Sequence, residues 1–244
     1  MKRLQKVTAV AVLLVAGLLL ASNSAQARFP RRGPIGGFGY FSVGVRQLDV
    51  AEMNRLLKAK GFAPFSKTAA IMGGGGLAVA RKWVIGGEGF GIVGRKVNGP
   101  SAEARLTGGY GFFDLGRVLW KSTGSFGALM GGFGGGGMEI EVGSTSYPES
   151  FGAALDAPYH STRMSKGGLM AKLSLMGQFL VTRKKRGRCF NGLVIGFDAG
   201  YVLPIYESGW MIGEKNIGSG PASGITGPYL RITIGGGGFC GARR

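Results

Sequence analysis

A two-residue repeat of apolar side chains constrains this chain more than any other feature of its sequence. Between residues 169 and 181 the odd positions hold leucine, alanine, glycine, phenylalanine and valine, whereas the even positions include Lys172, Ser174 and Gln178. Successive side chains of a strand point to opposite faces, so this period predicts a strand with one apolar and one mixed, polar face. Similar stretches recur along the chain, which is therefore predicted to be all-β.

Eight such stretches are expected to be strands. They cover residues 38–46, 69–80, 83–93, 103–115, 126–142, 169–181, 193–203 and 229–239. Most reach the roughly 9–11 residues that a tilted strand needs to cross a bilayer. Glycine makes up 49 of the 244 residues and clusters within these stretches, where it permits the sharp coiling of a small barrel. Long links at about 47–68, 143–168 and 204–228, together with short basic links at about 81–82 and 182–192, favour an antiparallel up-and-down eight-stranded β-barrel.

The N-terminus has the pattern of a secretory signal peptide. Lys2, Arg3 and Lys6 precede an apolar run at residues 7–20, and an Ala-x-Ala site ends at Ala27. The run is short for a helical membrane anchor, which is the alternative. We expect residues 1–27 to be removed and residues 28–244 to form a single barrel domain.

The first long link is expected to contain a short helix. Asp49 is placed to cap it, with Glu52 three residues later as in a capping box, and Gly61 is placed to end it. Its apolar face would comprise Val50, Met53, Leu56 and Leu57. This face is expected to close the barrel mouth rather than to lie on the membrane surface.

Together, the signal pattern, the eight alternating segments and the sequence of long and short links resemble the small eight-stranded outer-membrane β-barrels. The resemblance covers residues 28–244 and rests on pattern rather than on a motif. It implies an outer-membrane protein of a Gram-negative cell envelope. One departure is at the C-terminus: such barrels commonly finish on an aromatic residue, whereas here Phe239 is followed by Cys240 and four further residues.

Charge points to anionic partners. The expected mature chain has 27 Lys and Arg residues against 12 Asp and Glu, a net charge of about +15. Membrane lipid, either anionic headgroups or lipopolysaccharide, is the expected partner, and export disfavours nucleic acid. The densest basic segment is Arg183, Lys184, Lys185, Arg186 and Arg188. On a turn it would meet anionic headgroups or simply be solvated.

The two cysteines are expected to form a disulfide. In the predicted topology Cys189 precedes the seventh strand and Cys240 follows the eighth, so both lie at the same end of neighbouring strands. An oxidising compartment favours the bond. With only two Cys and one His in the chain, no metal site or other cofactor is expected.

Six charged residues are predicted to face the lumen, because they alternate along the strands with the apolar residues that are expected to face outward. They are Glu88, Arg105, Glu139, Lys172, Asp198 and Arg231. A barrel this narrow is filled by side chains. An ion-paired polar core is therefore favoured over a polar path or a small binding site.

These features favour a non-enzymatic, monomeric outer-membrane barrel with a packed polar lumen and long surface loops for a structural or interaction role. One alternative is a soluble periplasmic or secreted lipocalin-like barrel, which would hold an apolar ligand inside. Another is a lipid-acting enzyme using His160 with Asp156, Tyr159 or Ser161, although proximity in sequence does not establish a catalytic triad.

Overall fold

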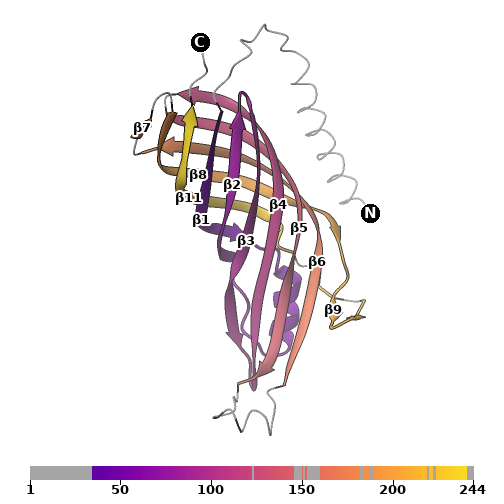
Figure 1. Ribbon diagram of the computed structural model, residues 1–244. Coiled ribbons are helices and arrows are strands. Elements are labelled where there is room, and N and C mark those ends of the chain that lie inside the picture. Colours follow the sequence, from indigo (N-terminus) through magenta and orange to yellow (C-terminus); the bar gives the residue numbers. More distant parts are fainter. Residues whose placement is uncertain are drawn as a thin grey trace.

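The computed structural model describes residues 35–240, apart from residues 123, 146–149, 151, 153–159, 182–183, 187–188, 219 and 222–223. Eight long strands form a closed barrel in which each pairs antiparallel with the next and the last pairs with the first (Figure 1). These strands are β1 (Ile35–Gln47), β2 (Thr68–Ala80), β3 (Trp83–Asn98), β4 (Ala102–Ser122), β5 (Ser125–Ser144), β6 (Ser161–Leu180), β8 (Cys189–Glu207) and β11 (Gly227–Cys240). The predicted fold class is confirmed. The signal peptide lies outside the described residues and stays a prediction.

The wall of the barrel is much higher on one side than on the other. Strands β3 to β6 have 16 to 21 residues, whereas β1 and β2 have 13 each. Pairing of β2 with β3 stops at Ile71 and Ile92, and pairing of β6 with β8 stops at Gly168 and Glu207. Beyond these points β3–β6 continue as an open curved sheet, which we call the extension (Figure 1). The predicted strands at 83–93 and 169–181 were therefore too short, because they leave out the parts of β3 and β6 that lie in the extension.

The extension lies at the end of the barrel where β1 stops, here called the helix end. The opposite end, where β1 begins and β11 finishes, is called the terminus end. At the helix end β9 (Met211–Ile212) and β10 (Lys215–Asn216) form a small hairpin, and β9 pairs with the extension part of β6. The extension and this hairpin enclose the helix on one side.

The predicted helix is present as α2 (Ala51–Ala59), but its predicted cap is wrong. Val50 occupies the N-cap position without a side-chain hydrogen bond, whereas Asp49 forms an isolated backbone bridge with Gly224. Burial of Val50 and Met53 against the barrel fixes the start of the helix instead. Leu56, expected on the apolar face, is exposed. The helix ends as predicted at Gly61, whose φ of +79° suits glycine.

A band of apolar side chains surrounds the outside of the barrel. On β6 it runs from Leu169 to Phe179, which are ten residues apart and both exposed. Ten residues of a strand tilted by about 40° rise roughly 25 Å, which matches the apolar band of outer-membrane barrels. Other members are Phe41, Val43, Val45, Met72, Ile85, Phe113, Leu115, Phe133, Leu175, Phe197, Leu230, Ile232 and Ile234. Among the described residues, no helix is both long and apolar enough to cross a bilayer.

The barrel is tied together covalently at the terminus end. Cys189 and Cys240 lie directly opposite each other on β8 and β11 and form a disulfide, which confirms the predicted pairing. The basic segment just before Cys189 was predicted to be a turn. It instead folds back as a short strand, β7 (Lys184–Arg186), which pairs with the start of β8. Arg183 and Arg188 lie outside the described residues.

Candidate functional site

Side chains fill the lumen in three layers. Towards the helix end, buried apolar residues of the wall pack against Val50 and Met53 of the helix region and against Trp210 of the last long link. Towards the terminus end, a second apolar cluster includes Leu77, Val79 and Phe126. Charged residues lie between the two clusters: along β3 the inward order is Val84, Glu88 and Phe90. The same order recurs on β6, with Met170, Lys172 and Met176.

The middle layer is a chain of alternating charges that crosses the lumen. Lys172 on β6 pairs with Glu88 on β3 and, at 2.8 Å, with Asp114 on β4. Arg231 on β11 pairs with Glu88 at 2.9 Å and also with Asp198 on β8. The order is therefore Asp114, Lys172, Glu88, Arg231, Asp198, with all five side chains buried. One residue comes from each of five strands, so this network of ion pairs joins opposite walls of the barrel.

Aromatic and polar groups complete this layer. The Tyr40 hydroxyl donates to Glu88 at 2.7 Å, and the Tyr229 hydroxyl donates to Asp198 at 3.3 Å. The Arg231 guanidinium lies 3.9 Å from the centre of the Phe90 ring. Buried charges need both opposite partners and hydrogen bonds to be tolerated in an interior. Arg231 and Glu88 have both, whereas Asp114 has the ion pair with Lys172 but no hydrogen bond from the described residues. The layer is therefore held mainly by its ion pairs.

A third cation, Arg46, is buried near the helix end of the layer. Its side chain is 1% exposed, and its guanidinium lies 4.5 Å from the centre of the Tyr110 ring. None of its nitrogens makes a hydrogen bond to the described residues. Arg46, Lys172 and Arg231 together match Glu88, Asp114 and Asp198 in number, so these buried charges sum to zero.

Glycine on the inner face makes room for the charged layer. Gly132 on β5 lies opposite both Asp114 and Lys172 in the strand register. A Cβ at this position would collide with the Asp114 carboxylate and would lie 3.1 Å from Cε of Lys172. The missing side chain is therefore required by the ion pairs beside it.

The structure brings together four of the six predicted lumen charges. These are Glu88, Lys172, Asp198 and Arg231. The other two predictions are wrong: Arg105 is exposed on the outer face of the extension, and Glu139 lies on that face between the inward Met138 and Ile140. Asp114 and Arg46 were missed. The signal for Asp114 was its position between Phe113 and Leu115, both of which point outward.

The residues considered for catalysis are not assembled into a triad in the described part of the chain. His160 is exposed, and Ser161 donates its hydroxyl hydrogen to Glu141 at 2.8 Å. Asp156 and Tyr159 lie outside the described residues. Across the described residues, no group of three His, Cys, Asp or Glu side chains is arranged to hold a metal ion.

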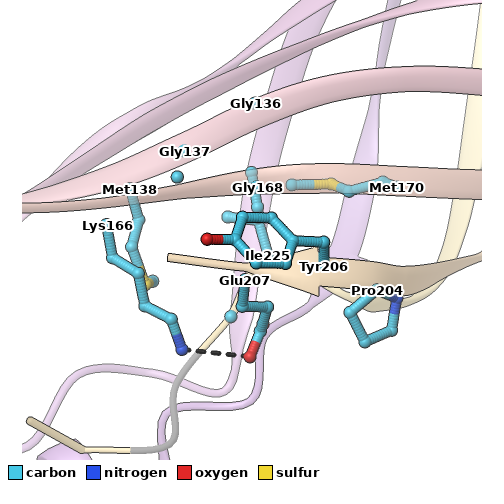
Figure 2. Close-up of a pocket in the computed structure, with 12 residues that line it drawn as sticks. Gly136, Gly137, Met138, Lys166, Gly168, Met170, Pro204, Tyr206, Glu207 and Ile225 are labelled. Atoms are coloured by element: carbon cyan, nitrogen blue, oxygen red, sulfur yellow. Dashed lines mark hydrogen bonds and ion pairs between the residues drawn. The ribbon is translucent and has the colours of Figure 1, made fainter. Parts of the chain in front are cut away.

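A pocket of about 270 Å³, counting the space at its open mouth, lies where β8 leaves β6 (Figure 2). Gly136 and Gly168 form part of its wall, and Met138 and Met170 supply apolar surface. Lys166 and Glu207, which also line it, form an ion pair at 3.1 Å. Its lining contains no serine, cysteine or histidine.

Comparison with known proteins yields distant structural likeness only. No family model and no curated protein sequence matches the chain. Among solved structures, Ail of Yersinia pestis is 12% identical with a TM-score of 0.43, covering 85% of this chain and 98% of Ail. OprG of Pseudomonas aeruginosa is 12% identical with a TM-score of 0.31, covering 85% of this chain and 95% of OprG. The outer-membrane protease OmpT of Escherichia coli is 12% identical with a TM-score of 0.30, covering 90% of this chain and 99% of OmpT. Likeness at this level carries no statement about activity, and the chain's own strand pairing establishes the closed eight-stranded barrel.

Proposed function

We propose that this protein is a non-enzymatic outer-membrane barrel that acts as a closed, monomeric anchor and holds the extension and helix α2 at the cell surface. The observation that carries the proposal is the reversed polarity of the barrel at one height. There the exposed side chains are apolar, and the buried ones include the chain of ion pairs centred on Glu88. A soluble protein has the opposite arrangement, because exposed apolar bands of this size are not stable in water.

A closed lumen follows from the way its contents are held. An open pore needs a continuous polar path, whereas here an apolar cluster lies on each side of the charged layer. The charged residues are also engaged with one another, since Glu88 contacts both Lys172 and Arg231. Moving an ion through this layer would require breaking buried pairs, which is costly in a low-dielectric interior.

The extension supports a role at the surface rather than within the bilayer. Its outer face carries charged pairs, such as Lys96 with Glu103 at 2.8 Å and Arg163 with Glu141 at 3.4 Å. Its inner face packs on α2. The helix is held by Asn54, whose side chain exchanges two hydrogen bonds of 2.8 Å with the backbone of Phe65. Such a packed, water-exposed structure is suited to a structural or interaction role.

Fractionation tests the location. The protein is expected to sediment with outer membranes, to require detergent for extraction, and to migrate differently on gels before and after heating. A protein that stays in the aqueous periplasmic or culture extract would contradict the proposal and support the lipocalin-like alternative.

Planar-bilayer recording tests the closed lumen. The purified protein is expected to show no reproducible open pore. A matched variant in which residues 51–59 are replaced by a Gly-Ser linker should also stay closed, because the charged layer and the terminus-end cluster are retained. Steady conductance from the intact protein would overturn the closed lumen. Conductance from the variant alone would show that the helix is the only seal.

A further inference from the structure

Acidic and basic residues are distributed very differently between the two ends of the barrel. The helix end carries both kinds. Its described basic residues are Arg55, Lys58, Lys60, Lys67, Arg95, Lys96, Arg105, Arg163, Lys166 and Lys215. Its described acidic residues are Asp49, Glu52, Glu103, Glu139, Glu141, Glu207 and Glu214. The lumen is balanced, as shown above. The excess positive charge of the chain therefore has to come largely from the terminus end.

Among the residues that the structure describes, every charged residue at the terminus end is basic. Arg81 and Lys82 form the turn between β2 and β3, and Arg117 and Lys121 lie near the end of β4. The short strand β7 adds Lys184, Lys185 and Arg186 to the same end, because it pairs with the first residues of β8. We call Arg81, Lys82, Arg117 and Lys121 the basic collar; the ammonium of Lys121 lies 5.1 Å from the centre of the Phe239 ring, at the barrel mouth. Every described Asp or Glu lies either in the lumen or at the helix end.

The backbone at Arg81 gives a second, independent indication. Its φ is +57°, and it is the only described residue other than glycine with a positive φ. Glycine adopts this conformation without strain, whereas an L side chain there costs about 1 kcal/mol. The first central position of a two-residue hairpin turn with this geometry is normally glycine. In a chain with 49 glycines, an arginine at this position indicates that its side chain has a role.

Exposed apolar residues lie directly beside the collar. Trp83 follows Lys82, and Trp120 precedes Lys121; both tryptophans are close to half exposed. Trp83 lies opposite Arg117 in the strand register. Tryptophan is enriched at the level of lipid headgroups, and basic side chains just beyond it reach the phosphates. A merely solvated turn would need neither the tryptophans nor the absence of acidic residues.

We infer that the basic collar binds the phosphate-bearing headgroups of anionic phospholipids in the leaflet that faces the terminus end. The inference rests on the proposed membrane location and names the lipid class that one end of the barrel selects. Near a membrane surface each basic residue strengthens binding to anionic lipid by up to about fivefold. The effect is electrostatic, so it weakens as the salt concentration rises.

Native mass spectrometry with matched lipids tests this inference. The detergent-solubilised protein is titrated with phosphatidylglycerol or with phosphatidylcholine of the same acyl chains. The native protein is expected to retain phosphatidylglycerol preferentially. The triple variant Arg81→Gly, Lys82→Asn, Arg117→Gln keeps a favourable turn and should lose up to about 100-fold of that preference. The matched control neutralises the same number of charges at the helix end, as Lys58→Gln, Lys60→Gln, Lys67→Gln, and should keep it.

Several outcomes would overturn the inference. Equal retention of the two lipids by the native protein would show that the collar does not select anionic headgroups. An equal loss in the control variant would show that net charge, rather than the collar, is responsible. Full displacement of the lipid by an equal concentration of soluble glycerol phosphate would assign the site to free phosphate esters. A protein that is soluble without detergent contradicts the membrane proposal itself, whereas a detergent-dependent barrel without lipid preference contradicts the collar alone.

Discussion

One strand, β4, shows two opposite arrangements along its length. At the height of the apolar band its outward residues are Phe113 and Leu115, and its inward residue is Asp114. Eight residues closer to the helix end, the outward residue is Arg105 and the inward residue is Leu106. The alternation of side chains does not change between the two regions. What changes is the solvent: apolar side chains face outward where lipid is proposed, and inward where the outside is water.

The two regions are consequently stabilised by different interactions. In the extension, Leu106, Met138 and Ile140 pack with the helix as in a soluble protein, and charge pairs cover the outside. At membrane height, the interior contains the ion pairs of Lys172 and Arg231. Equivalent substitutions in the two regions should therefore have unequal effects, and each of the following pairs tests that difference.

The largest difference is expected between two lysines of β6. Lys172→Met removes the shared partner of Glu88 and Asp114 and leaves a buried carboxylate uncompensated. Such losses lower the free energy of unfolding by about 3–5 kcal/mol. Lys166→Met breaks the ion pair with Glu207 at the helix end, where Glu207 is substantially exposed, and should cost about 1 kcal/mol or less.

Reversible urea unfolding in detergent or lipid measures both lysine variants, with the heat-modifiable folded fraction as the check on refolding. Similar losses of stability for Lys172→Met and Lys166→Met would contradict the proposed difference between the lumen and the extension. They would show that the lumen is as hydrated as the extension. A Lys172→Met variant that does not fold at all still agrees with the larger effect, provided that Lys166→Met folds.

The outward face of β4 provides the next pair. Phe113→Arg places a cation in the apolar band and should destabilise the membrane-inserted barrel by about 2–4 kcal/mol. Thr107→Arg makes the same type of change in the extension, directly opposite Glu139. It should change the free energy of unfolding by no more than about 0.5 kcal/mol. Unfolding from lipid vesicles is the appropriate measurement, and equal tolerance of both variants would mean that Phe113 does not contact lipid.

The sequence was sufficient to predict the barrel, because alternation and link lengths are local features. All eight strands, and the disulfide between Cys189 and Cys240, were predicted from them. The errors at Arg105 and Glu139 have one physical cause. Charge was equated with the lumen along the whole of each strand, whereas above the apolar band charged side chains belong on the outside. That boundary depends on how far β3–β6 rise beyond their neighbours, which is a tertiary property.

Other features of the charged layer depend on packing and were not predictable. Alternation places Glu88 and Lys172 inside the barrel, but they are 84 residues apart, and nothing in either segment indicates that they meet. Arg46 follows the outward Val43 and Val45 at the spacing that places it inside, and it was missed at the very end of the predicted strand. The helix cap was misassigned because burial of Val50 outweighs the capping preference of Asp49.

Two glycines provide a third, smaller contrast, between the inside and the outside of the wall. Gly132→Ala introduces a methyl group against Asp114 and Lys172 and should destabilise the barrel by about 1–3 kcal/mol. Gly236→Ala on the apolar outer face meets no atom within 4 Å. It should be neutral or stabilising by up to about 1 kcal/mol, because alanine is less flexible in the unfolded chain. Urea unfolding of both variants decides the matter, and equal costs would mean that the charged layer can shift to accommodate the methyl group.

The smallest effect is expected from a charge on the water-facing side of the extension. The Ser161 hydroxyl, which donates to Glu141, lowers the pKa of that carboxyl, and Arg163 lowers it further. A lowered folded-state pKa stabilises the extension above the unfolded pKa, and this contribution is lost as the pH falls through the folded value. The pair is partly exposed, so its contribution should not exceed about 1 kcal/mol and should decrease with salt.

A pH titration of the Glu141 carboxyl by carbon NMR measures this contribution directly. Ser161→Ala and Arg163→Gln should each raise the pKa of Glu141 towards its ordinary value, because each removes a group that stabilises the carboxylate. The same variants should leave the unfolding of the membrane-height region unchanged, since neither residue contacts the charged layer. If Ser161→Ala left the pKa of Glu141 unaltered, the outer face of the extension would be an array of solvated charges without specific pairing. Ion pairs would then stabilise only the lumen, and the extension would be held together by its buried apolar contacts alone.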